Sequence, residues 1–246
     1  MGKYPLRMKK HLPNIFTSLN LLAGCMAVVM IFRDHMEWAA YLIFLAAFFD
    51  LLDGMAARVL RLNSAYGKEL DSLADMVSFG FVPGIVVFKL LQQSEMDALA
   101  LPESVLALVQ FAPFVITIFS ALRLAKFNLD TRQTNSFIGL PVPANTLFVV
   151  SLPMILIQEV GKYDVILLNP VVLLILSILL SLLLVSEIPL FSLKFKSLSV
   201  KENLYQYTLL ILSAILIPVF HWTAVPLIFA LYFILSIVNN ISQKQT

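Results

Sequence analysis

Charge is scarce in this chain. Only 13% of its 246 residues are Asp, Glu, Lys or Arg, while 60% are hydrophobic. In soluble domains roughly a quarter of the residues are charged. No soluble fold of this size could bury so much apolar surface, so the composition excludes a soluble globular protein and predicts a polytopic membrane protein. The net charge of +2 is too small to indicate a nucleic-acid partner.

Cysteine and histidine are also rare. The single cysteine, Cys25, lies within an apolar run, which excludes a disulfide within the chain. His11, His35 and His221 are scattered and form no metal-binding set. The basic N-terminal stretch followed by "LLAGC" looks like a lipoprotein signal, but the apolar run continues to Phe32. We therefore interpret it as the first membrane span.

Uncharged apolar segments of membrane-spanning length recur along the chain, and they should be helices because backbone polar groups in hydrocarbon need internal hydrogen bonds. The last two come from one uncharged run that "PVFHWTAVP" divides. We thus expect an all-α polytopic membrane protein of about eight transmembrane helices, at residues 14–32, 38–58, 72–91, 105–125, 139–158, 165–186, 204–220 and 223–241.

The basic residues predict an orientation. Lys and Arg gather before the first span, between the second and third, after the fourth and after the sixth, whereas the other loops are acidic or neutral. Because basic loops stay inside, both termini are expected to be cytoplasmic. No internal repeat is apparent, so residues 1–246 are expected to form a single domain without the inverted repeat of many transporters.

Four aspartates lie at the ends of two of these apolar segments, in "DLLDGMAARVLRLNSAYGKELDSLAD". Asp50 and Asp53 lie near the end of the second span, and Asp71 and Asp75 lie at the start of the third. Spacings of three and four put each pair on one helix face, and the short connection lets the pairs face each other. Their repulsion could be relieved by protonation, by Arg58 or by metal.

We favour a metal-binding role for these aspartates. The alternative is that they are ordinary helix-end carboxylates exposed to water. Clustered carboxylate oxygens suit Mg²⁺ or Mn²⁺. Two divalent cations would cancel the four charges, and two-metal sites are a usual device of phosphoryl chemistry. Ionisable residues inside membrane segments are also functional by default.

The aspartates belong to a longer spaced pattern. Its fixed residues, within 50–75, are Asp50, Asp53, Gly54, Ala57, Arg58, Gly67, Asp71 and Asp75. At every position this pattern resembles the signature of the CDP-alcohol phosphotransferase family. The resemblance implies an integral membrane enzyme with a six-helix core that displaces CMP from a CDP-linked lipid or alcohol. It further implies divalent metal held by the four aspartates, Asp75 as the base, and a homodimer.

Further blocks, at 12–24, 72–84, 121–145 and 185–198, resemble the phosphatidylserine synthases of this family. That resemblance implies transfer of the phosphatidyl group from CDP-diacylglycerol to the hydroxyl of L-serine, giving phosphatidylserine and CMP. Relatives often carry Arg where this chain has Lys126, a difference that keeps the charge but loses the bidentate fork.

The carboxylate of serine needs a fixed cation in its binding site. Arg suits this role better than Lys, because its guanidinium can donate two parallel hydrogen bonds to a carboxylate. Arg123 and Lys126 lie at the cytoplasmic end of the fourth span, with Arg123 as first candidate, and Asn128 could bond the acceptor or the nucleotide. Alternatively the two cations only anchor the helix by snorkelling. The nearby "GLPVPAN" is either a rigid substrate-lining turn or the start of the fifth span.

The remaining candidates concern CDP-diacylglycerol. Its proposed contacts are Gly54, Ala57, Arg58, Gly67, Asn14 and Thr17. The three small residues would leave room for the nucleotide, although their alternative role is close helix packing. Asn14 and Thr17 would hydrogen-bond the nucleotide, or else form an N-cap and first helical turn.

Two other functions stay open. One is the same chemistry with another acceptor: inositol phosphate, glycerol phosphate or choline. The other is a cation-coupled transporter or channel, against which the lack of a repeat and the position of the acids at one membrane face both count. The predicted location is a bacterial inner membrane, with the active site facing the cytoplasm.

Overall fold

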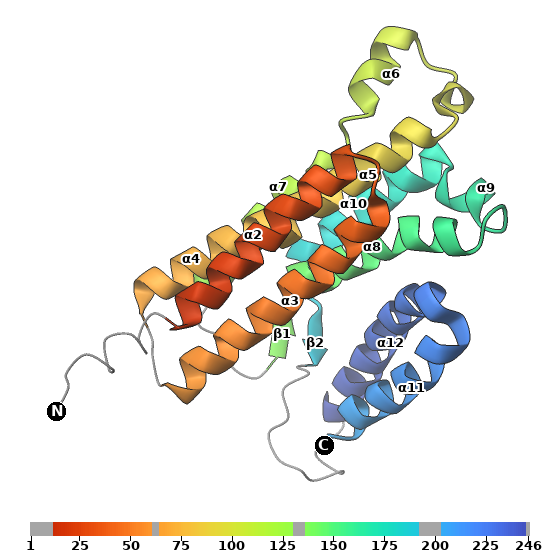
Figure 1. Ribbon diagram of the computed structural model, residues 1–246. Coiled ribbons are helices and arrows are strands. Elements are labelled where there is room, and N and C mark those ends of the chain that lie inside the picture. The colour runs from red at the N-terminus through yellow and green to blue at the C-terminus, as the bar shows by residue number, and fades with distance from the viewer. Residues whose placement is uncertain (1–11, 61–63, 130–135, 192–202, 245–246) are drawn as a thin grey trace.

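A computed structural model describes residues 12–60, 64–129, 136–191 and 203–244 (Figure 1). The N-terminal basic stretch and parts of the blocks at 121–145 and 185–198 lie outside these ranges. The helices are α2 (Leu12–Phe32), α3 (Met36–Val59), α4 (Ala65–Asp75), α5 (Val82–Gln93), α6 (Glu103–Val109), α7 (Phe114–Leu129), α8 (Val142–Gln158), α9 (Asp164–Leu167), α10 (Pro170–Val185), α11 (Leu204–Phe220) and α12 (Ala224–Lys244).

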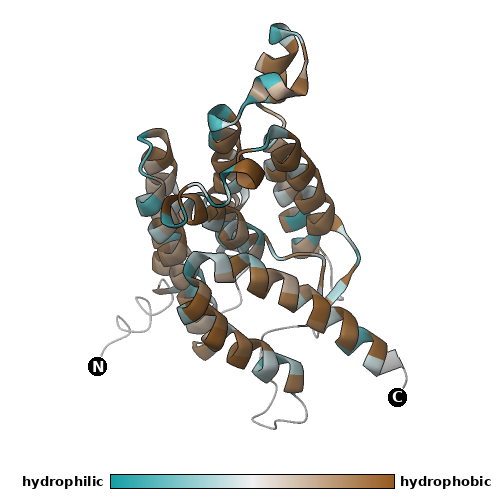
Figure 2. Ribbon diagram, turned by 90° about the vertical axis from the view of Figure 1, so that its right-hand side faces the viewer, coloured by the Kyte–Doolittle hydropathy of each residue, from teal (hydrophilic) through white to brown (hydrophobic). Residues whose placement is uncertain are grey.

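The predicted all-α membrane class is confirmed. Within the described residues, five helical segments are long and apolar enough to cross a membrane: Leu12–Phe32, Met36–Val59, Ala65–Gln93, Glu103–Leu129 and Leu204–Ser242. Helices α8 and α10 are apolar but shorter. Hydrophobic residues dominate the helices, and hydrophilic ones gather at helix ends and loops (Figure 2). The count of eight crossings and the orientation stay predictions.

The long C-terminal run divides where its sequence predicted. A short 3₁₀ turn, His221–Thr223, separates α11 from α12, and the two helices pack side by side (Figure 1). His221 has a positive φ of 49°, so the chain reverses there. The hairpin is held to the rest of the protein mainly by α12, whose Tyr232 hydroxyl donates to the Phe191 carbonyl at 2.9 Å.

A small sheet was not expected from the sequence. Strand β1 (Ser136–Ile138) pairs antiparallel with β2 (Pro189–Phe191), with Ser136 opposite Phe191. Three-residue strands leave little periodic signal, which is why helix-length patterns missed them. The pairing joins the segment after α7 to the segment after α10.

The third span is one continuous helix with a wider turn inside it. A π-helical stretch, Met76–Phe81 (η1), links α4 to α5 directly after Asp75. Neighbouring helices approach it closely over small residues: a Cβ added at Gly24 of α2 would lie 2.7 Å from the Ser78 Cα. A Cβ added at Gly84 of α5 would lie 2.5 Å from the Thr117 Oγ1 of α7. Such small-residue contacts are how membrane helices pack tightly.

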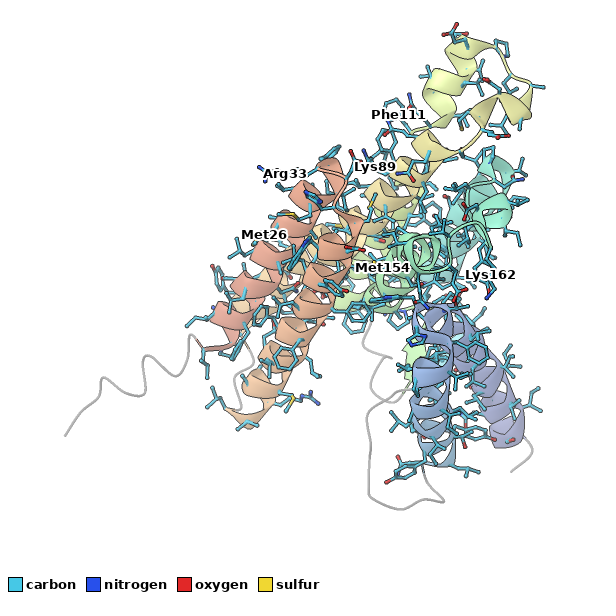
Figure 3. The ribbon with its side chains drawn as sticks, turned by 45° about the vertical axis from the view of Figure 1, so that its right-hand side comes forward. Met26, Arg33, Lys89, Phe111, Met154 and Lys162 are labelled. Carbon is cyan, nitrogen blue, oxygen red and sulfur yellow. The ribbon has the colours of Figure 1, made fainter. Side chains whose placement is uncertain are left out.

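The opposite end of the bundle carries its own polar contact. Asp34, in the turn between α2 and α3, pairs with Lys89 of α5 at 2.7 Å. Figure 3 places Lys89 and the neighbouring Arg33 at the same end of the bundle. This ion pair links the turn between α2 and α3 to α5 at that end.

Candidate active site

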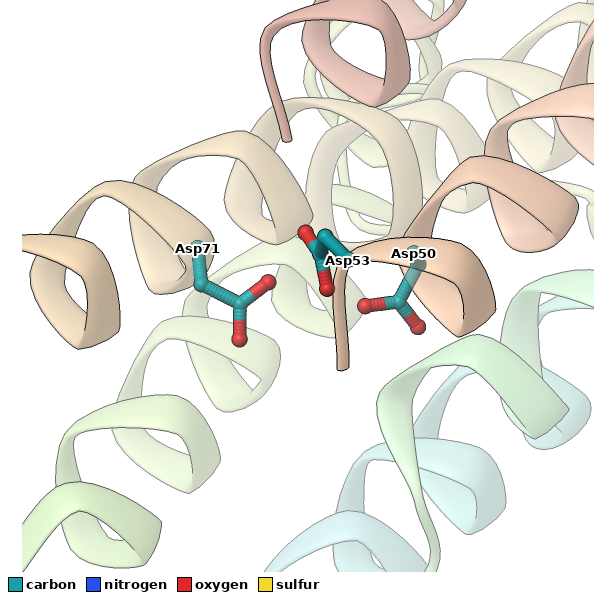
Figure 4. A group of neighbouring side chains, drawn as sticks. All are labelled: Asp50, Asp53 and Asp71. Carbon is teal, nitrogen blue, oxygen red and sulfur yellow. The ribbon is translucent and has the colours of Figure 1, made fainter. Parts of the chain in front are cut away.

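The acidic residues of two helices face each other, as their spacing predicted. Figure 4 shows the carboxylates of Asp50 and Asp53, from α3, turned toward that of Asp71, from α4. One oxygen from each of the three lies within 4.8 Å of the others. Helix α2 packs against both α3 and α4 and so holds the two acidic helices in place. We call these three residues the acidic cluster.

Basic residues of the described chain leave the acidic cluster without a counter-charge. Among the residues that the structure describes, no Lys or Arg forms an ion pair with it. Arg58, one candidate for this role, is exposed and its Nε donates to the Gly54 carbonyl of its own helix at 2.9 Å. Clustered carboxylates with no counter-charge repel strongly, so they require a proton or a cation.

A divalent cation fits this donor set. Asp53 is only 6% exposed, and the Asp71 Oδ1 is buried without a hydrogen-bond partner in the described chain. Carboxylate oxygens converging from two helices are the hard ligands that Mg²⁺ and Mn²⁺ prefer. The cluster can therefore hold a metal ion.

Asp75 lies close enough to the acidic cluster for all three charges to act on it, but it is held by a different hydrogen-bond partner. It is the last residue of α4, at the junction with η1, and is 9% exposed. Its Oδ1 accepts a hydrogen bond from the Asn20 Nδ2 at 3.0 Å. π-helical turns are frequent at functional sites because they re-aim side chains within a helix. Asp75 thus has its own environment, and its role as a metal ligand stays a prediction.

Helix α2 supplies both polar partners of the aspartates. The Thr17 Oγ1 donates to the Asp53 Oδ2 at 2.7 Å, and it also contacts the Pro13 carbonyl. Thr17 and Asn20 are three residues apart, hence on one face of the helix. Thr17 therefore lies inside α2 and serves Asp53, rather than forming an N-cap. Asn20 was missed from the sequence; its only signal was a polar amide inside an apolar span.

The small residues of the signature differ in their surroundings. A Cβ added at Gly54 would meet nothing within 4 Å, so this glycine borders open space beside Asp53. At Gly67 a Cβ would lie 2.9 Å from the Ser64 Oγ, which caps the start of α4, and 3.6 Å from the Asn14 Oδ1. Ala57 is half-buried on α3. Space for a ligand is thus found at Gly54, while Gly67 permits the approach of α2.

Of the three predicted serine contacts, Arg123 lies deepest. It is 6% exposed, its guanidinium lies 4.8 Å from the Phe127 ring centre, and its charge interacts with that of Asp75. Its Nη2 is buried without a hydrogen-bond partner in the described residues. A buried guanidinium nitrogen that lacks an acceptor is suited to an anionic ligand.

Lys126 and Asn128 already have protein partners. Lys126 is exposed and pairs with Glu187 at 3.3 Å. The Asn128 Nδ2 donates to the Ser72 Oγ at 2.8 Å, and the backbone carbonyl of Asn128 accepts from the Lys68 Nζ at 2.7 Å. These bonds tie the end of α7 to α4, which carries two of the aspartates.

The segment "GLPVPAN" begins α8, with Pro141 before its first turn. Asn145 in that first turn is fully buried, and both polar atoms of its side chain lack a partner among the described residues. Its neighbour Thr146 donates to the Phe79 carbonyl of η1. The segment therefore starts a helix, as one interpretation predicted, whereas a membrane crossing by α8 and a role in lining the substrate both stay predictions.

Comparison with known proteins identifies the family. Residues 10–195 match the model of the CDP-alcohol phosphatidyltransferases, a range that holds the acidic cluster and Asp75. A CDP-diacylglycerol–serine O-phosphatidyltransferase of Methanocaldococcus jannaschii is 34% identical over 172 residues, which cover 70% of this chain and 69% of the relative. One from Bacillus subtilis is 32% identical over 54% of this chain and 70% of the relative.

A similar protein of the same name from Helicobacter pylori is 34% identical over 140 residues, which cover 56% of this chain. The chain spans just over half of that relative's length, 55%. The family model, by contrast, matches most of the chain, and it includes every described residue of the site. The chain therefore belongs to the CDP-alcohol phosphatidyltransferase family.

Proposed function

We propose that this protein transfers the phosphatidyl group of CDP-diacylglycerol to the hydroxyl of L-serine, giving phosphatidylserine and CMP. The observation that carries the proposal is the division of the four aspartates into a cluster of three and a separately held Asp75. Family membership supports the chemistry, and the names of the similar proteins support serine as the acceptor.

Asp75 would act on the acceptor. We assign it as the base that takes the proton of the serine hydroxyl. The freed oxygen would form a bond to the phosphorus that bears diacylglycerol, while the bond from that phosphorus to the bridging oxygen breaks and CMP leaves in line. The Asn20 hydrogen bond fixes one oxygen of Asp75, which leaves the other to face the acceptor.

The acidic cluster would act on the donor. Asp50, Asp53 and Asp71, with Asp75 as a further ligand, would hold two divalent cations, Mg²⁺ or Mn²⁺. When bound, such ions neutralise the pyrophosphate and stabilise the charge on departing CMP. Thr17 would hold Asp53 in its orientation for this purpose.

The two substrates would approach from different sides. Open space beside Gly54 suits the nucleotide, and Asn14, Ala57, Arg58 and Gly67 border the same ends of α2, α3 and α4. For the serine carboxylate we assign Arg123, because Lys126 and Asn128 are engaged elsewhere. We place the site at the cytoplasmic face of a bacterial inner membrane, where a lipid substrate meets a water-soluble one.

A panel of acceptors tests the proposal. Purified protein in detergent is given CDP-diacylglycerol and Mn²⁺ or Mg²⁺, with L-serine, glycerol 3-phosphate, inositol phosphate, choline or no acceptor, and CMP release is measured. We expect CMP release only with serine. Release with a phosphorylated acceptor instead would keep the chemistry but overturn the substrate. Ion flux in vesicles, and no CMP with any acceptor, would favour a transporter.

A further inference from the structure

The side-chain amide of Asn20 has a hydrogen-bond partner for its nitrogen but, among the described residues, none for its oxygen. Its side chain is fully buried, and the Nδ2 donates to the Asp75 Oδ1 at 3.0 Å. A carboxylate only accepts hydrogen bonds, so the amide nitrogen must face it and the amide oxygen must point elsewhere. That Asn20 Oδ1 is buried and has no partner among the described residues. A buried carbonyl without a donor is costly, which indicates a ligand that supplies one.

A second buried polar group near Asp75 lacks a partner among the described residues. The Arg123 Nη2 is buried without a partner in the described chain, and the Arg123 charge interacts with Asp75. Asn20 comes from α2 and Arg123 from α7, and both helices pack against η1, the turn that follows Asp75. The surroundings of Asp75 therefore offer one neutral acceptor and one cationic donor, both unsatisfied.

These two groups complement an amino-acid zwitterion. An ammonium group donates and matches the Asn20 Oδ1, while a carboxylate accepts and matches the Arg123 Nη2. In serine the amine and the hydroxyl are attached to adjacent carbon atoms. An ammonium bound to the oxygen of the Asn20 amide would therefore bring the hydroxyl beside Asp75, which is bound to the nitrogen of the same amide.

We propose that Asn20 binds the ammonium group of the acceptor while it holds Asp75, and so selects an acceptor with adjacent amine and hydroxyl groups. The inference rests on the proposed function and deepens it. A site built to hydrogen-bond a polar group rejects analogues that lack it, since its own buried groups are then left unpaired. Asn20 is thus a specificity-determining residue as well as a positioning residue for Asp75.

Two analogues of serine separate the two contacts. 3-Hydroxypropanoate lacks the amine, and ethanolamine lacks the carboxylate. Each is tested as an acceptor for CMP release and as a competitor of radiolabelled L-serine binding, which does not require turnover. The variants are Asn20→Ala and Arg123→Gln. Ser78→Ala is the control, because it removes a buried hydrogen bond to the Ala74 carbonyl on the helix that carries Asp75.

The expected result is a crossed pattern. In Asn20→Ala, the preference for serine over 3-hydroxypropanoate falls about 10-fold or more, while the preference for serine over ethanolamine is kept. In Arg123→Gln, the preference for serine over ethanolamine falls by a similar factor, while the preference for serine over 3-hydroxypropanoate is kept. In the binding assay, Asn20→Ala should raise the Ki of ethanolamine by about the same factor as the Kd of serine and leave the Ki of 3-hydroxypropanoate unchanged. Arg123→Gln should raise the Ki of 3-hydroxypropanoate in the same way and leave that of ethanolamine unchanged. Ser78→Ala should keep both preferences.

Other outcomes overturn the inference. If Asn20→Ala weakens serine and both analogues equally, Asn20 only supports Asp75 and does not contact the acceptor. Should Asn20→Ala fail to elute as folded protein, Asn20→Ser, which keeps a small polar group, takes its place in the same comparison. Wild-type protein that releases no CMP with serine overturns the proposed function itself, whatever the variants do.

Discussion

The Thr17 hydroxyl of α2 lies 2.7 Å from the Asp53 carboxylate of α3 and donates a hydrogen bond to it. Three residues further along the same helix face, Asn20 donates to Asp75 of α4. One helix without any acidic residue thus orients carboxylates on two others. The first span is therefore part of the site, although the family signature within 50–75 does not include it.

Removing the Thr17 hydroxyl should weaken metal use. Thr17→Val keeps the shape of the side chain but leaves Asp53 without its donor. Because hydrogen bonds to charged groups contribute roughly 1.5–3 kcal/mol, we expect the Mn²⁺ concentration for half-maximal CMP release to rise about 10-fold. The KM for serine should change little. A Mn²⁺ titration measures both.

The matched control is Thr208→Val. The Thr208 hydroxyl of α11 donates to the Leu204 carbonyl one turn earlier, as the Thr17 hydroxyl does to the Pro13 carbonyl. Thr208 is distant in sequence from the acidic residues. An unchanged Mn²⁺ requirement in Thr17→Val, or an equal change in both variants, would show that the Thr17 bond does not serve the metal.

Divalent cations should stabilise the protein through the acidic cluster. Without a cation, three close carboxylates repel one another, so Mg²⁺ or Mn²⁺ should raise the midpoint of thermal unfolding in detergent. Asp71→Asn should abolish this shift and raise the midpoint measured in EDTA, because it removes one of the repelling charges. A wild-type midpoint that does not respond to either ion would contradict a metal site here.

Two glycines should respond differently to an added side chain. Gly54→Val meets open space, so the fold should be kept while the KM for CDP-diacylglycerol rises. Gly84→Val would meet the Thr117 Oγ1 and should lower the midpoint of unfolding, since overpacking costs about 1–3 kcal/mol. Unfolding curves together with CMP release distinguish the two. Normal use of CDP-diacylglycerol by Gly54→Val would exclude a nucleotide at this position.

The two basic residues near the end of α7 should contribute unequally to serine binding. Arg123→Lys keeps the positive charge but cannot donate two parallel hydrogen bonds to the serine carboxylate, so the KM for serine should rise about 10-fold. Lys126→Gln should raise it far less, because Lys126 is exposed and its ion pair with Glu187 is of a kind that contributes about 0–1 kcal/mol. Steady-state kinetics with varied serine measure both values. A larger effect at Lys126 would reverse the assignment.

Local spacing was enough to predict how the acidic helices meet. Steps of three between Asp50 and Asp53, and of four between Asp71 and Asp75, fix a shared face within each helix. A connection of a few residues then brings the two faces together. The confirmed opposition of Asp53 and Asp71 depends on nothing more distant than that connection.

Contacts between distant segments were not predictable in the same way. Asn20 bonds a residue 55 positions away, and Lys126 bonds Glu187 across 61 positions. The pairing of β1 with β2 is equally remote. No local periodicity encodes such partners, because they depend on how α2, α7 and α10 are arranged in three dimensions. The burial of the Asn145 side chain, and its lack of a partner among the described residues, likewise became visible only in the folded chain.

The most direct test of the central claim is CMP release by wild-type protein and Asp75→Asn, each with saturating Mn²⁺ and CDP-diacylglycerol, with and without L-serine. The account predicts serine-dependent release by the wild type and a loss of at least about 100-fold in the variant, as expected when a general base is removed. Both proteins should show the same elution from a sizing column. Serine-dependent release that persists in folded Asp75→Asn would contradict the account.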